Sequence, residues 1–177
     1  MTKFFSRFRN LIRDEEGAAT VEFVVVFPFF VVTFLSAFEV AAMNIRAVSM
    51  ERATDIAVRD IRLNKGGNIP YGQVLNDICE RSFMIPDCKQ SVKIELVNVA
   101  TIGQNLPPAE IDCVRRNAKI QPPARFTPGV ENELMLIRVC AVIDPMFPTV
   151  GVGRTMPKDA SGGYIVSASS AFVNEPQ

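Results

Sequence analysis

Residues 17–43 read GAATVEFVVVFPFFVVTFLSAFEVAAM, a glycine followed by an apolar stretch long enough to cross a membrane. A single acidic residue, Glu22, precedes the sixteen uncharged residues from Phe23 to Phe38. An ionised carboxylate is strongly unfavourable in hydrocarbon, so an acidic residue there usually has a partner or marks a functional site. Cleavage after Gly17 would create a positive partner, the α-amine of Ala18, and would make Glu22 the fifth residue of the mature chain.

The charges before the apolar stretch predict its orientation. Basic residues remain on the cytoplasmic side of a membrane, and four of them precede the stretch: Lys3, Arg7, Arg9 and Arg13. We therefore expect a single-pass inner-membrane protein with a cytoplasmic leader at residues 1–17 and a transmembrane helix at residues 18–43. Residues 44–177 would form a periplasmic head that includes the second half of the long helix.

The helix is expected to extend well beyond the membrane. No glycine occurs between Gly17 and Gly66, and 46 helical residues from Ala18 to Leu63 would span roughly 70 Å, against about 30 Å of hydrocarbon. Pro28 removes one backbone hydrogen bond, which predicts a kink or a melted turn at that position. The second half of the helix carries an apolar stripe that needs a surface to cover: Met43, Ala47, Met50, Ala57 and Ile61.

The rest of the chain favours an α+β fold. Alternation and β-branched residues predict strands at Ser91–Thr101, Glu133–Ile143 and Tyr164–Phe172, with a short edge strand at Ile111–Arg115. A second helix is expected over Tyr71–Ser82. The predicted architecture is a long N-terminal helix, transmembrane and then amphipathic, packed on a small, mainly antiparallel sheet.

Four cysteines suit an oxidising compartment and allow three disulfide connectivities. We favour Cys79 with Cys88, because a short loop closes locally, and Cys113 with Cys140, because two strand-like segments can lie side by side. The sequence leaves other pairings open, and also four reduced cysteines that pack as small hydrophobic residues. Zinc is disfavoured, since the spacings are wrong for paired ligand turns and the chain has no histidine.

Several function classes have little support in the sequence. The chain has 19 basic and 19 acidic residues spread along its length, so we expect no nucleic-acid binding. Without histidine, a serine or cysteine nucleophile lacks its usual base, and we expect neither catalysis nor a cofactor. The glycine-containing stretches Gly151–Arg154 and Phe126–Asn132 are interpreted as turns, because the first lacks the features of a phosphate-binding loop.

Glu39 lies at the far end of the apolar stretch. Such a residue is most often simply interfacial. The alternative is a specific contact between subunits, for which Arg46 of a neighbouring subunit is a candidate.

Residues 13–28, RDEEGAATVEFVVVFP, resemble the N-terminal signature of the TadE-like proteins of tight-adherence (Flp) pilus systems, which are pseudopilins or minor pilins. The resemblance extends over residues 13–63. It implies a pilin-like fold, a prepilin peptidase cut between Gly17 and Ala18, and a role for Glu22 in neutralising the amine of a neighbouring subunit. The implied partners are other pilin or pseudopilin subunits, the peptidase, the inner-membrane assembly platform and membrane lipid. The resemblance does not separate a TadE-like from a TadF-like role, or a filament subunit from a platform-bound one.

Two other interpretations stay open at this point. The small residues Val40, Ala41 and Ala42 could serve a signal peptidase, which would release a periplasmic binding module starting at Met43. An uncut anchor could instead hold an adaptor head at the membrane. The N-terminus of the mature chain distinguishes all three interpretations.

Overall fold

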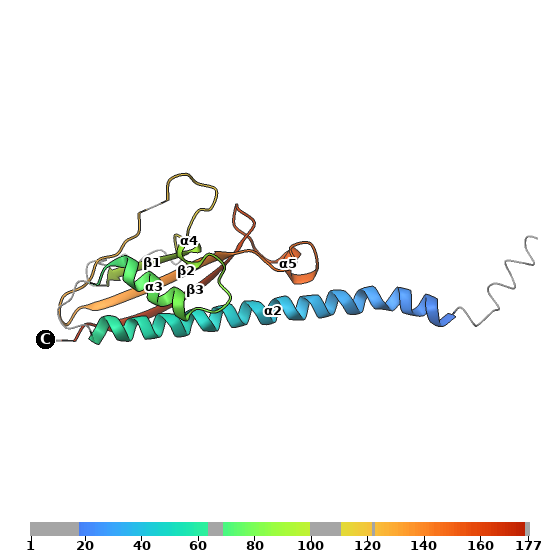
Figure 1. Ribbon diagram of the computed structural model, residues 1–177, viewed down its shortest axis with the longest axis horizontal. Helices are drawn as coiled ribbons and strands as arrows, with labels where there is room; N and C mark the ends of the chain where they lie inside the picture. Colours follow the sequence, from blue (N-terminus) through green and yellow to red (C-terminus); the bar gives the residue numbers. More distant parts are fainter. Residues whose placement is uncertain (1–17, 64–68, 100–110, 122, 176–177) are drawn as a thin grey trace, which may run out of the picture.

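The structure is a computed structural model that describes residues 18–63, 69–99, 111–121 and 123–175. Figure 1 shows a long helix that runs beneath a small head and then projects well beyond it. The α+β architecture predicted from the sequence is confirmed. The elements in chain order are α2 (Ala18–Leu63), α3 (Tyr71–Arg81), α4 (Cys88–Ser91), β1 (Val92–Asn98), β2 (Leu134–Ile143), α5 (Gly151–Thr155) and β3 (Tyr164–Val173).

The helix α2 is 46 residues long and has the bounds expected from the sequence. It continues through Pro28 without interruption, so the predicted melted turn is wrong. Proline removes only one of the backbone hydrogen bonds of the helix, and the turns on both sides keep it continuous. The kink at Pro28 stays a prediction.

The sheet is antiparallel, with strand order β1-β2-β3. Its register places Ile94 of β1 opposite Val139 of β2, and Val139 opposite Ala168 of β3. The three predicted strands are confirmed, and only their ends differ by one to three residues.

The core forms where α2 and α3 pack against the sheet. Met50 and Ala57 of the predicted stripe are fully buried, while Met43, Ala47 and Ile61 are half-buried against the same core. The periodicity of the second half of α2 therefore predicted its buried face correctly. The strands contribute Ile94, Leu96, Ile137, Val139, Val166 and Ala168, and α3 contributes Val74 and Ile78.

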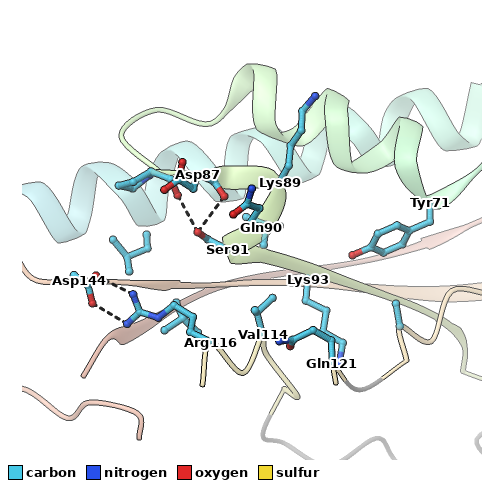
Figure 2. A pocket seen from close by; sticks show the side chains of 15 residues that line it. Tyr71, Asp87, Lys89, Gln90, Ser91, Lys93, Val114, Arg116, Gln121 and Asp144 are labelled. Atoms are coloured by element: carbon cyan, nitrogen blue, oxygen red, sulfur yellow. Dashed lines mark hydrogen bonds and ion pairs between the residues drawn. The ribbon is translucent and has the colours of Figure 1, made fainter. Parts of the chain in front are cut away.

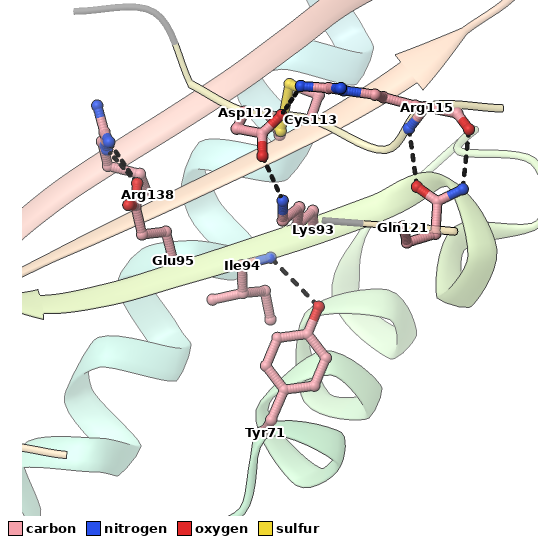
Figure 3. Close-up of a disulfide and its surroundings, with 10 residues drawn as sticks. Tyr71, Lys93, Ile94, Glu95, Asp112, Cys113, Arg115, Gln121 and Arg138 are labelled. Atoms are coloured by element: carbon pink, nitrogen blue, oxygen red, sulfur yellow. Dashed lines mark hydrogen bonds and ion pairs between the residues drawn. A yellow bond between two sulfur atoms is a disulfide. The ribbon is translucent and has the colours of Figure 1, made fainter. Parts of the chain in front are cut away.

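Both favoured disulfides are present. Cys79–Cys88 joins the end of α3 to α4, and Cys113–Cys140 attaches an irregular segment to the middle of β2 (Figure 3). The buried side chains of Cys113, Cys140 and Val142 form a second, smaller cluster.

The predicted edge strand at Ile111–Arg115 is wrong, because this segment has no strand structure. Cys113 and a hydrogen bond of 2.9 Å from Lys93 Nζ to Asp112 Oδ2 hold the segment across the sheet instead of along its edge. At Leu96, backbone hydrogen bonds with Arg125 and Thr127 occupy the edge of β1. Phe126 therefore bridges to a strand, and the turn predicted for Phe126–Asn132 is confined to its last two residues.

Candidate membrane and assembly interface

The N-terminal half of α2 exposes a continuous apolar surface. Large exposed side chains cover it on all sides: Val21, Phe23, Val24, Val25, Val26, Phe27, Phe29, Phe30, Val32, Phe34 and Phe38. Exposed apolar patches of this size mark contact with a membrane or with another protein. Among the described residues, α2 is the one helix long and apolar enough to cross a membrane, so the structure is compatible with an N-terminal membrane anchor.

The predicted processing site lies at the boundary of the described residues. Gly17 and the leader at residues 1–17 lie outside them, whereas Ala18 is the first residue of α2. Glu22 lies in the second turn of the helix and is exposed. Within the part of the chain that the structure describes, no side chain pairs with the carboxylate of Glu22. The described part of the fold thus leaves this carboxylate available to a group outside it.

Glu39 has a role that the sequence did not reveal. Its side chain is 0% exposed, and its carboxylate accepts backbone hydrogen bonds from Met146 N at 3.0 Å and from Phe147 N at 2.8 Å. The partners lie just after β2, more than one hundred residues along the chain, and no local pattern connects them to Glu39. Glu39 therefore attaches the head to the helix within one chain.

Arg46 is likewise occupied inside the chain. It is 5% exposed, and its Nε donates a hydrogen bond of 3.0 Å to the carbonyl of Met84. Its Nη1 donates to the hydroxyl of Tyr164 at the start of β3. The contact between Glu39 and a neighbour's Arg46 is therefore not supported, because each side chain is buried against its own head.

Two glycines allow the segment after β2 to pack closely, Gly153 against the segment itself and Gly151 against α2. A Cβ on Gly153 would lie 2.3 Å from the carbonyl oxygen of Phe147 and 3.4 Å from Glu39 Oε2. Gly151 has φ +54°, and its Cβ would lie 2.0 Å from Ser36 Oγ. The turn predicted over Gly151–Arg154 is instead the short helix α5, which packs directly on α2.

The far side of the head carries an open groove lined by Tyr71, Lys89, Gln90, Lys93, Arg116 and Asp144 (Figure 2). Two of its three cations, Lys93 and Arg116, are already paired. Arg116 binds both carboxylate oxygens of Asp144 at 2.8 and 2.7 Å, and this hydrogen bonding holds the pKa of Asp144 below its usual range. The hydrogen bond from Lys93 similarly lowers the pKa of Asp112. These pairs stabilise the wall of the groove. They leave neither Lys93 nor Arg116 free to bind a ligand.

No metal site emerges in the described ranges. Within them, no group of three or more cysteine or acidic side chains is positioned to hold a metal ion. The four cysteines are all in disulfides.

Comparison with known proteins finds a match over the part of the chain that contains Glu22 and Glu39. The family model described as TadE-like protein matches residues 17–59, which cover most of α2. No curated protein and no solved structure matches the chain. The family match supports involvement in a tight-adherence pilus system. The resemblance to the TadE-like proteins is thus confirmed for residues 17–59, the segment that contains Glu22 and Glu39.

Proposed function

We propose that this protein is a minor pilin or pseudopilin of a tight-adherence (Flp) pilus, a structural subunit and not an enzyme. The observation that carries the proposal is the projecting half of α2, which exposes apolar side chains throughout and carries one carboxylate, Glu22, near its start. The family match over residues 17–59 supports the same role. In this proposal, α2 holds the protein in the inner membrane with the head in the periplasm.

Processing by a prepilin peptidase would place a new ammonium group at the first residue of α2. The N-terminus of a helix already carries partial positive charge from its unpaired N–H groups. An ammonium group there favours an approaching carboxylate still more. Glu22 follows Ala18 by about one helical turn and is exposed, so it can approach the amine of an adjacent subunit. Pairing these charges offsets the cost of removing both from water.

The interpretation as a secreted module is disfavoured by the junction with the head. Cleavage after Ala42 would remove Glu39 and leave the N–H groups of Met146 and Phe147 without their acceptor. Hydrogen bonds to a charged acceptor are stronger than those between neutral groups, so their loss would weaken the packing of the segment after β2. The packing of the head therefore depends on a part of the helix that precedes Ala42.

The proposal is tested by substituting Glu22 and measuring assembly. Glu22→Gln keeps the shape of the side chain and removes its charge, so we expect normal membrane insertion and normal cleavage but loss of pili. Glu51→Gln is the matched control, because Glu51 is an exposed glutamate on the same helix beside the head. Normal piliation with Glu22→Gln would contradict the charge-pair mechanism. Loss of pili with both variants would show that the effect is not specific to Glu22.

A further inference from the structure

The segment from Pro145 to Met156, here called the junction loop, lies beside the apolar half of α2 (Figure 1). The ring of Phe147 packs edge-on against the ring of Phe38, with centroids 6.2 Å apart. Gly151 reaches farther, to Ser36 Oγ and the carbonyl of Val32. Phe38 is the last residue of the uncharged stretch that begins at Phe23. The junction loop therefore lies level with the outer end of the apolar stretch.

The length of the helix shows how deep in the membrane the junction loop would lie. The 21 residues from Ala18 to Phe38 span about 30 Å, which equals the thickness of the hydrocarbon layer. Ser36 and Val32 then lie roughly 3 to 9 Å inside the outer boundary. Amphipathic elements that lie on a membrane are buried to a similar depth, at the boundary between headgroups and acyl chains.

The exposed side chains of the junction loop suit the boundary between headgroups and acyl chains. Met146 is 42% exposed, and Pro148 is also exposed. Two exposed cations follow, Arg154 in α5 and Lys158 shortly after it, and no acidic residue occurs between Pro145 and Lys158. Among described residues, no carboxylate pairs with either cation, and Lys158 Nζ reaches only the carbonyl of Pro148 at 3.4 Å. This pattern of apolar residues followed by basic ones fits an anionic bilayer surface.

The junction loop is also held firmly enough to act as a stop. Glu39 accepts two of its backbone N–H groups, and Gly151 lies so close to Ser36 of α2 that a Cβ would not fit between them. A surface fixed to the helix in this way would set how far the helix can enter the membrane. It would thereby set the depth of Glu22.

We propose that the junction loop rests in the outer headgroup layer and binds the phosphates of anionic lipids through Arg154 and Lys158. The inference rests on the proposed insertion of α2 into the membrane. It adds a second membrane contact, made by the head, that neither the helix nor its family match assigns.

The chain contains no tryptophan, so a single introduced tryptophan reports its own depth. We would place the full chain in nanodiscs whose lipids carry bromine on the acyl chains, which quench tryptophan emission at short range. Three variants are compared: Phe30→Trp within the apolar stretch, Met146→Trp on the junction loop, and Ile120→Trp on the head, where the side chain is 86% exposed. We expect strong quenching of Phe30→Trp, clear quenching and a blue shift of Met146→Trp, and neither for Ile120→Trp.

The three positions separate the two proposals. If Phe30→Trp is quenched while Met146→Trp behaves like Ile120→Trp in protein with both disulfides formed, the junction loop does not rest on the membrane. If Phe30→Trp itself is not quenched, membrane insertion by α2 is wrong. Burial of Met146→Trp in assembled pili but not in nanodiscs would assign the junction loop to a subunit contact and overturn the lipid proposal.

The headgroup contact is tested with the lipid composition. Quenching of Met146→Trp should be greater in nanodiscs containing phosphatidylglycerol than in phosphatidylcholine alone. Adding Arg154→Gln and Lys158→Gln should abolish that difference, whereas Lys89→Gln, which alters an exposed lysine on the head, should preserve it. Equal quenching in the two lipids would overturn the role of the anionic phosphates.

Discussion

Glu39 and Phe147 are 108 positions apart in the chain, yet the N–H of Phe147 donates a 2.8 Å hydrogen bond to Glu39 Oε2. This bond and its neighbour from Met146 make a buried carboxylate the joint between an apolar helix and a folded head. Hydrogen bonds to a charged group are stronger than those between neutral groups. The two hydrogen bonds therefore fix the position of the head relative to the helix.

Glu39→Gln should destabilise the head. An amide retains one oxygen acceptor but turns an NH2 group toward a backbone donor, so one buried N–H loses its partner. We expect the free energy of unfolding to fall by about 1–3 kcal/mol. Denaturant unfolding of the detergent-solubilised chain measures it, with Glu51→Gln as the exposed control on the same helix. Equal stability of the two variants would show that the hydrogen bonds at Glu39 contribute little.

Gly153→Ala should loosen the junction loop. Its Cβ would lie 2.3 Å from the backbone oxygen of Phe147 within the same loop, so the loop must rearrange next to the N–H groups that Glu39 accepts, and the melting temperature should fall. Gly72→Ala is the matched control, because nothing lies within 4 Å of its Cβ and the residue is in α3. Alanine is favoured over glycine in a helix by roughly 0.5–1 kcal/mol, so the control should be neutral or stabilising. A Gly153→Ala variant as stable as Gly72→Ala would contradict the close packing.

Asp144 should contribute to the acid limb of the stability curve. Hydrogen bonding from Arg116 lowers its pKa below the ordinary value of 3.8. A carboxyl group with a lowered folded-state pKa stabilises the protein above its unfolded-state pKa, and this stabilisation is lost as pH falls through the folded-state value.

Asp144→Asn should therefore lower stability near pH 6 and have little effect near pH 2. The side chain of Asp144 is 68% exposed, so solvent screening keeps the effect small. Asp55→Asn, an exposed aspartate on α2, is the control. A pH dependence of stability identical for wild type, Asp144→Asn and Asp55→Asn would argue against a stabilising ion pair.

The two disulfides should contribute unequally. Cys113–Cys140 spans a separation of 27 residues and Cys79–Cys88 one of 9. In the chain-entropy description, the longer loop adds about 1 kcal/mol more stability. Paired alanine substitutions, compared by denaturant unfolding, measure the difference. A larger loss from removing Cys79–Cys88 would show that native contacts around α3 and α4 outweigh loop entropy.

Features with a local sequence signal were predicted well. The apolar period gave the buried face of α2 around Met50 and Ala57, and β-branched alternation gave all three strands. The disulfide pairing was also correct, although Cys113 lies in an irregular segment and not in the expected strand.

Features that depend on contacts distant in sequence were missed. Glu39 binds backbone N–H groups, which every residue except proline carries, so no residue pattern identifies its partners. The segment Ile111–Arg115 has strand-like composition but is held by a disulfide and by Asp112 across the sheet. In short segments such contacts outweigh intrinsic strand propensity.

The most direct test of the account is the N-terminus of the mature chain. The protein would be extracted from membranes of cells with an active prepilin peptidase, and its intact mass compared with that from cells carrying an inactive peptidase. We predict a chain that begins at Ala18 only when the peptidase is active. A chain that keeps Met1 or Thr2 in the presence of active peptidase, or a soluble chain that begins at Met43, would contradict the proposed role as a pilus subunit.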